Sequence, residues 1–163
     1  MPPLKLVALD ADDLAIVAAH LQDAVMRLDD IAYRPKAQRF AMVLNRFDWQ
    51  KALAVGDART PSNVRRRAAI RFEHVRAVRR QNIAQGSPDA VLSLLTISFE
   101  QIEAPAGYVT LVFAGGGAIR LDVEYIEAEL RDLGAAWSAA GRPDHEADLS
   151  QQPGGQSPRK RSP

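Results

Sequence analysis

Alternation of apolar and polar residues with a period of two runs through much of this chain and restricts its fold more than any other feature. Phe40, Met42 and Leu44 fall on one side of such a run, which we place at residues 38–49. A period of two is typical of a β-strand with one buried face, because successive side chains point to opposite faces of a sheet. We therefore expect a chain built mainly on strands.

Further runs of the same kind extend this pattern along the chain. The expected strands cover residues 5–9, 25–34, 38–49, 66–80, 90–103, 108–113 and 118–123. Short links join most of them, which favours an antiparallel meander over a parallel sheet with helical crossovers. Residues 50–64 lack the alternation and are predicted to form a loop.

Three consecutive glycines, Gly115 to Gly117, join the last two of these strands. Glycine reaches positive φ at little cost, so such a link suits a hairpin turn. A phosphate-binding loop would instead need a helix directly after the glycines. Ile119, Leu121 and Val123 keep the period of two, so the pattern favours the turn.

Two helices are expected to flank the strands. Asp10 suits an N-cap, and Leu14, Val17 and Leu21 follow at helical spacing, so the first helix should end near Asp23.

The second helix is predicted near the C-terminus of the domain. It lies between a cap at Asp122 and a terminal glycine at Gly134, with Ile126, Leu130 and Leu133 along one face. The predicted fold class is α+β: an antiparallel, barrel-like sheet with an N-terminal helix and a capping C-terminal helix. This order of elements is similar to that of pleckstrin-homology-like barrels, an analogy of fold that implies no function.

Composition divides the chain into a single domain at residues 4–137 and a tail at 138–163. The tail is rich in Pro, Gly, Gln and Ser with few apolar residues, so we expect it to be disordered. The chain has no cysteine, no apolar run long enough to span a membrane and no signal-peptide pattern at its N-terminus. We expect a cytoplasmic protein without a membrane partner.

Sequence motifs for catalysis are weak. Asp10 and Asp12 follow an apolar run and resemble the nucleophile motif of haloacid-dehalogenase-type phosphatases, but Leu14 stands where that family has Thr or Val. The three histidines are isolated in the sequence and form no metal-binding motif. We assign no catalytic, metal-binding or cofactor-binding residue and expect no cofactor.

The densest cluster of polar residues in the chain is rich in arginine. Residues 64–81 hold seven arginines and one acid, Glu73, which is a net charge of +6, whereas the whole chain has +1 and the rest therefore −5. Three interpretations stay open. The strand is neutralised by acids of neighbouring strands, it forms a surface for a protein partner, or it grips a nucleic-acid backbone. The acids considered for neutralisation are Asp29, Asp30, Glu100 and Glu103.

A second candidate surface is the segment LNRFDW, because tryptophan and arginine commonly anchor interfaces. The alternative is an aromatic pair that closes one end of the barrel. Taken together, the candidate interaction residues are Arg46, Trp49, Arg66, Arg71, Arg76, Arg79 and Arg80.

Four segments of the chain resemble a known family. They are LNRFDW, IRFEHVRAVR, LSLLTISFE and FAGGGAIRLDVEYIEAELRDLGAAW. Together they are similar to the DUF2948 family, and the resemblance covers residues 4–145. It implies a cytoplasmic protein of alphaproteobacteria, and it brings no activity and no site residues.

The function expected from the sequence is a non-enzymatic binding or adaptor module of a bacterial cytoplasm. The alternative is a nucleic-acid-binding protein that uses the arginine-rich strand 65–80, and a second alternative is an enzyme of unrecognised type. A protein partner is favoured over nucleic acid, and a homodimer formed through an exposed sheet edge stays open.

Overall fold

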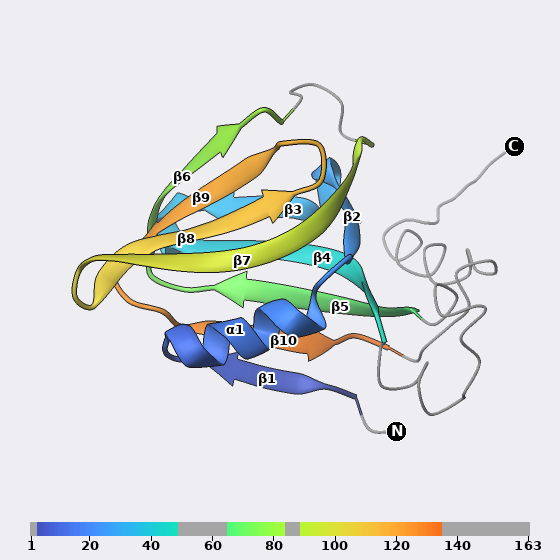
Figure 1. The fold of residues 1–163 in the computed structure, drawn as a ribbon, viewed down its shortest axis with the longest axis horizontal. Helices are drawn as coiled ribbons and strands as arrows, with labels where there is room; N and C mark the ends of the chain where they lie inside the picture. The colour runs from blue at the N-terminus through green and yellow to red at the C-terminus, as the bar shows by residue number, and fades with distance from the viewer. Residues whose placement is uncertain (1–2, 49–64, 84–88, 135–163) are drawn as a thin grey trace, which may run out of the picture.

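Strands make up most of the part of the chain that the structure describes, which covers residues 3–48, 65–83 and 89–134 of a computed structural model (Figure 1). These ranges contain one α-helix, α1 (Ala11–His20), and two short 3₁₀ helices, η1 (Leu28–Asp30) and η2 (Pro35–Ala37). The strands are β1 (Lys5–Ala8), β2 (Val25–Arg27), β3 (Ile31–Arg34), β4 (Arg39–Phe47), β5 (Arg65–Phe72), β6 (Val75–Gln81), β7 (Val91–Glu103), β8 (Ala106–Phe113), β9 (Ala118–Val123) and β10 (Ala128–Asp132). No helix in these ranges is long and apolar enough to cross a membrane.

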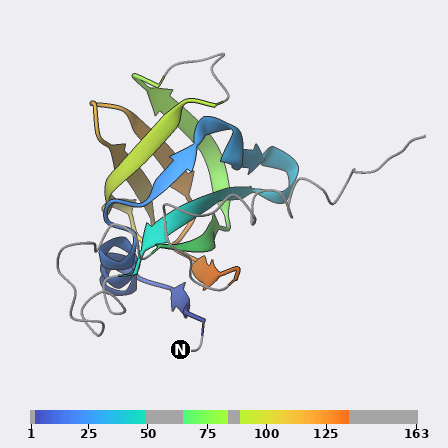
Figure 2. The same ribbon diagram turned by 90° about the vertical axis from the view of Figure 1, so that its right-hand side faces the viewer.

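One antiparallel sheet contains all of these strands. Its order is β1-β10-β5-β4-β2-β7-β8-β9-β6, and β3 pairs with β4 beside β2. The sheet rolls around a common interior (Figure 2), so that its edge strand β6 comes back toward β3. Tyr33 Oη donates to the Val75 carbonyl at 2.9 Å, and the Val75 N–H donates to the Gln38 carbonyl at 2.9 Å. In the described part no ladder joins β3 to β6, so the sheet stays open and the predicted pleckstrin-homology-like barrel is wrong.

Apolar side chains on the inner face of the rolled sheet form the core. In the register of β8 and β9, Val109 lies opposite Leu121 and Leu111 opposite Ile119, and all four are fully buried. Thr110 between them points to the outer face. Burial stabilises side chains of this size by about 1.5–3 kcal/mol each, so the alternation fixes which face of each strand lies inside.

The N-terminal helix predicted from the sequence is confirmed as α1. The carboxylate of Asp10 accepts from the Asp13 backbone N–H at 2.8 Å, an N-cap bond typically worth about 1 kcal/mol. Leu14 and Val17 are buried, as is Leu21 directly after the helix. The helix packs against β7 and β1 and so joins the two parts of the sheet (Figure 1).

The glycine-rich link is confirmed as the turn between β8 and β9. Gly115 and Gly116 have φ of +90° and +93°, in the region that residues with a Cβ rarely adopt. The Phe113 N–H donates to the Gly117 carbonyl at 2.9 Å and closes the turn. Because β9 follows at once, no helix terminus faces the glycines and no phosphate-binding loop is formed there.

The predicted C-terminal helix between Asp122 and Gly134 is wrong. The last described element is the strand β10, which pairs with β1 on one side and β5 on the other. Leu130 and Asp132 are buried with the spacing of a strand, whereas Leu133, expected on the apolar face of a helix, is 50% exposed. Leu130 fits the spacing of a helix and that of a strand equally well. The segment forms a strand because it pairs with β1 and β5.

The long strand predicted at residues 66–80 is two strands joined by a corner. His74 at the corner has φ of 60°, a left-handed conformation. On one side β5 pairs with β4 and β10, and on the other β6 pairs with β9, with a bulge between Val75 and Ala77. The predicted loop at 50–64, Trp49 and the predicted tail at 138–163 lie outside the described residues.

The close pairing of β7 with β8 is testable at Gly107. A Cβ placed there would clash with the Glu100 carbonyl oxygen and would lie 2.6 Å from the Phe99 ring. We expect Gly107→Ala to lower the free energy of unfolding by about 1–3 kcal/mol, because backbone would have to move. Urea denaturation measures this change. The control Gly134→Ala, with nothing within 4 Å of the added Cβ, should stay within about 0.5 kcal/mol of the wild type, and equal effects would contradict the register.

Candidate functional site

Two of the candidate arginines are buried in ion pairs. Arg46 Nε and Nη2 contact the two carboxylate oxygens of Asp132 at 2.9 and 3.1 Å. Arg66 Nε contacts Asp48 Oδ2 at 2.6 Å, and its Nη1 lies 3.9 Å from Asp132 Oδ2. These four residues, called the buried ionic cluster below, are each at most 6% exposed. The two positive charges match the two negative charges, so neither guanidinium is open to a partner.

The alternation along the strands places this cluster inside the sheet. Arg46 and Asp132 continue the inward-facing apolar series of β4 and β10, and Arg66 lies opposite Arg46 in register. The Asp132 carboxylate also accepts from the Leu4 backbone N–H at 2.8 Å. The cluster therefore joins β4, β5, β10 and the segment before β1.

Two further candidate arginines form ion pairs on the surface. Arg71 donates to Glu73 at 2.6 Å and to Glu129 at 2.5 Å. The hydrogen bond to Glu73, together with the charge of Glu129, raises the pKa of Arg71 above its usual value although partial burial opposes this. Arg76 donates to Asp122 at 3.0 Å. Both guanidinium groups are thus neutralised by carboxylates of this chain.

The acids in these pairs differ from those predicted. Neutralisation was expected from Asp29, Asp30, Glu100 and Glu103, whereas the acids found belong to β9, β10 and the ends of β4 and β5. The sheet order explains the difference, because β4 and β10 flank β5, and β9 flanks β6. The strand that carries Glu100 and Glu103, β7, lies between β2 and β8 instead.

The remaining arginines of β6 lie at the exposed edge of the sheet. Arg79 lies opposite Arg120 of β9 in register on the outer face, whereas Arg80, the next residue, lies opposite the buried Ile119. All three are exposed and line the same groove, and we call them the arginine face. In the described part of the chain none of them has a carboxylate within ion-pair distance. They line a groove of about 550 Å³ in which Glu100 is the one acid among the described lining residues, so these residues carry a net charge of +2.

The arginine face is held on rigid strands. The Arg120 guanidinium lies 4.1 Å from the centre of the Tyr108 ring, a cation–π contact that fixes its position. Thr110 lies opposite Arg120 on β8 and adds a hydroxyl to the same groove. Guanidinium groups suit carboxylate and phosphate through their planar fork of N–H donors. The arrangement can therefore bind an anionic group.

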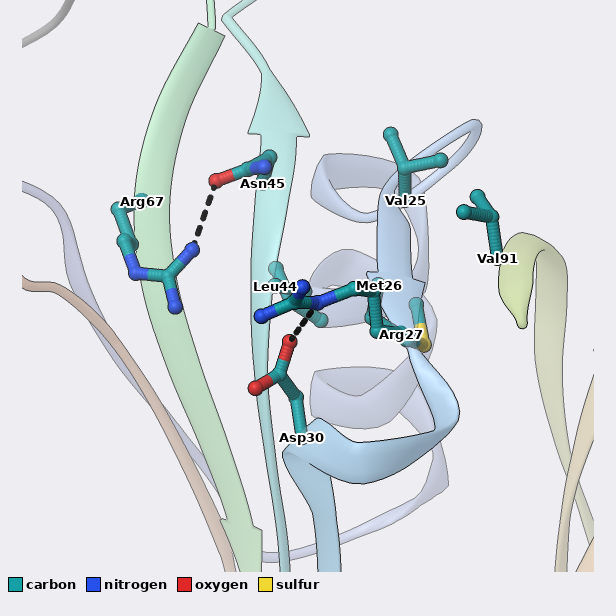
Figure 3. A pocket seen from close by; sticks show the side chains of 8 residues that line it. All are labelled: Val25, Met26, Arg27, Asp30, Leu44, Asn45, Arg67 and Val91. Carbon is teal, nitrogen blue, oxygen red and sulfur yellow. Dashed lines mark hydrogen bonds and ion pairs between the residues drawn. The ribbon is translucent and has the colours of Figure 1, made fainter. Parts of the chain in front are cut away.

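A smaller recess of about 150 Å³ lies between β2, β4 and β5 (Figure 3). Arg67 Nη1 donates to Asn45 Oδ1 over a long 3.4 Å, and Arg67 Nε is buried without a hydrogen-bond partner. Arg27 Nε lies 3.8 Å from Asp30 Oδ2, near the limit of an ion pair. The recess therefore holds two guanidinium groups and one carboxylate.

Only part of the arginine face was predicted from the sequence. Arg79 and Arg80 were among the candidate residues, whereas Arg120 and Tyr108 were not. Arg120 stands between the buried Ile119 and the buried Leu121 of β9. The period of two therefore placed its side chain outward, but only the pairing of β9 with β6 brings it beside Arg79.

A histidine–carboxylate pair lies at the corner between β5 and β6. His74 Nε2 lies 2.7 Å from Glu127 Oε1, and the His74 ring lies on that of Tyr125 with centroids 4.1 Å apart. The Glu124 N–H donates to the His74 carbonyl at 3.0 Å, so the corner is held by several contacts. Among the described residues no group of three or more His, Asp or Glu side chains is arranged to hold a metal ion.

Fold and site together define an α+β protein with an open, rolled antiparallel sheet and an arginine-lined groove on its outer face. The chain belongs to the DUF2948 family, described as a protein of unknown function, whose model matches residues 4–145. The searches of curated proteins and of solved structures returned no significant match.

The contrast between buried and surface ion pairs is testable on two aspartates. Asp132→Asn leaves Arg46 buried beside a neutral group and should lower the free energy of unfolding by about 3–5 kcal/mol. Asp122→Asn removes the surface partner of Arg76 and should cost less than about 1 kcal/mol. Urea denaturation of the two variants measures both changes, and a loss at Asp132 no larger than at Asp122 would show that the cluster does not hold the fold.

Proposed function

We propose that this protein is a non-enzymatic binding or adaptor module that holds an acidic segment of a partner protein on the arginine face. The observation that supports this most is the division among the arginines of β5 and β6. Arg66, Arg71 and Arg76 are neutralised by acids of the chain, whereas Arg79 and Arg80 are exposed near Arg120 and have no acid partner among the described residues. A cytoplasmic, bacterial setting is part of the same proposal.

The position of the arginine face at a sheet edge favours an extended protein segment as the partner. One edge of β6 pairs with β9, and in the described part the other edge pairs with no strand. Backbone groups along such an edge can pair with an incoming strand while side chains beside it select the sequence. A homodimer through this edge would place two copies of Arg79 and Arg80 close together, and their repulsion favours an acidic partner over a second copy.

Nucleic acid is the alternative partner, and one feature argues against it. Tyr108 is the aromatic residue beside the face, and the Arg120 guanidinium already covers its ring, so it offers no free surface for a base. An enzyme of unrecognised type is disfavoured because arginine does not give up its proton at neutral pH and so cannot serve as a general base.

Binding to model anions tests the proposal. The probes are a labelled glutamate-rich decapeptide and a single-stranded oligonucleotide of equal charge, titrated by fluorescence anisotropy at two salt concentrations. Replacing Arg79, Arg80 or Arg120 by Gln should weaken peptide binding about tenfold each, because each change removes a charge-assisted hydrogen bond. Arg76→Gln is the matched control, since Arg76 is exposed on the same strand but already paired with Asp122.

The outcomes separate the alternatives. Peptide binding that depends on the arginine face and not on Arg76 supports the proposal. Tighter binding of the oligonucleotide through the same three residues would move the assignment to nucleic acid. Peptide binding that is absent, or equally sensitive to Arg76→Gln, would contradict the proposed site.

A further inference from the structure

The recess between β2, β4 and β5 is a second place where arginines outnumber acids among the described residues, and it is separate from the arginine face. Figure 3 shows the guanidinium groups of Arg27 and Arg67 pointing toward each other across it. Arg27 comes from β2 and Arg67 from β5, with β4 between the two strands in the sheet order. Two cations that face each other repel unless an anion lies between them.

The contacts within the recess leave this repulsion largely uncompensated. Asp30 is the one carboxylate present, and it lies 3.8 Å from an Arg27 side chain that is 56% exposed. Among the described residues, Arg67 has a single side-chain hydrogen bond, the 3.4 Å contact with Asn45, and its Nε is buried without a partner. A polar atom buried in this way calls for a ligand, water or functional explanation.

The size and walls of the recess limit what can fill it. Its volume of about 150 Å³ has room for roughly five water molecules, at about 30 Å³ each, and falls below the roughly 300 Å³ at which pockets for larger ligands begin. Val25 and Val91 line it beside the polar groups, so part of its wall is apolar.

We propose that the recess binds a small protonated oxyanion, the class to which inorganic phosphate belongs, bridged between Arg27 and Arg67. The two guanidinium forks donate to its oxygens. Asp30 would repel a fully ionised anion, but it can accept a hydrogen bond from an anion that keeps a proton. Hydrogen phosphate carries such a proton at neutral pH and sulfate does not, so the site should prefer phosphate.

Calorimetric titration of the full chain with inorganic phosphate tests this, with sodium sulfate and sodium chloride at equal ionic strength as comparison. We expect phosphate to bind, sulfate to bind at least several-fold more weakly, and Arg67→Gln to weaken phosphate binding about tenfold or more. Arg27→Gln gives a second reading in a variant expected to fold normally, because the side chain is largely exposed. Arg76→Gln, whose guanidinium is already paired with Asp122, should leave phosphate binding unchanged.

Three results would overturn the inference. They are no phosphate binding beyond the effect of sodium chloride, binding that survives both Arg27→Gln and Arg67→Gln, and equal affinity for sulfate. The arginine face is tested with a peptide and with other variants. A negative result at one site therefore does not affect the conclusion about the other site.

Discussion

The ion pair between Arg46 and Asp132 is the interaction on which the rest of the structure depends. It is buried and bidentate, and the Asp132 carboxylate also accepts from the Leu4 backbone. β10 lies between β1 and β5, so this carboxylate ties the N-terminal edge of the sheet to its centre. Breaking such a pair leaves a charge without a partner in the interior, which costs far more than the loss of a surface pair.

The presence or absence of an acid partner also distinguishes the other arginines of the described strands. Where the sheet order brings an acid to a guanidinium, as at Arg71 and Arg76, the charge serves the fold. At Arg79 and Arg120, which lie opposite each other, no carboxylate of the described residues lies within ion-pair distance, and this is the surface that we propose for a partner. The proposed surface is therefore defined less by how many arginines a segment holds than by which strands lie beside it.

This dependence on strand order explains which features the sequence could predict. α1 and the glycine turn follow from local contacts, the cap at Asp10 and the positive φ at Gly115, and both were predicted correctly. β10 was mistaken for a helix because Leu130 fits either period, and the outcome rests on pairing with β1 and β5.

The ion pairs could not be predicted from the sequence, because they too depend on the order of the strands in the sheet. Asp132 lies 86 residues from Arg46, so no local pattern connects them. The prediction of one continuous strand at residues 66–80 was wrong, since the corner at His74 sends β5 and β6 to different neighbours and the alternation of β5 turns Arg66 inward.

Nuclear magnetic resonance of the arginine Nε–Hε groups tests the central claim most directly, because it reports each guanidinium separately in the intact protein. On titration with the glutamate-rich peptide, the account predicts that the signals of Arg79, Arg80 and Arg120 shift while those of Arg46 and Arg66 stay in place. Shifts at Arg46 and Arg66 that match those of the arginine face, or no shift at the arginine face, would contradict the division between arginines that hold the fold and arginines that bind.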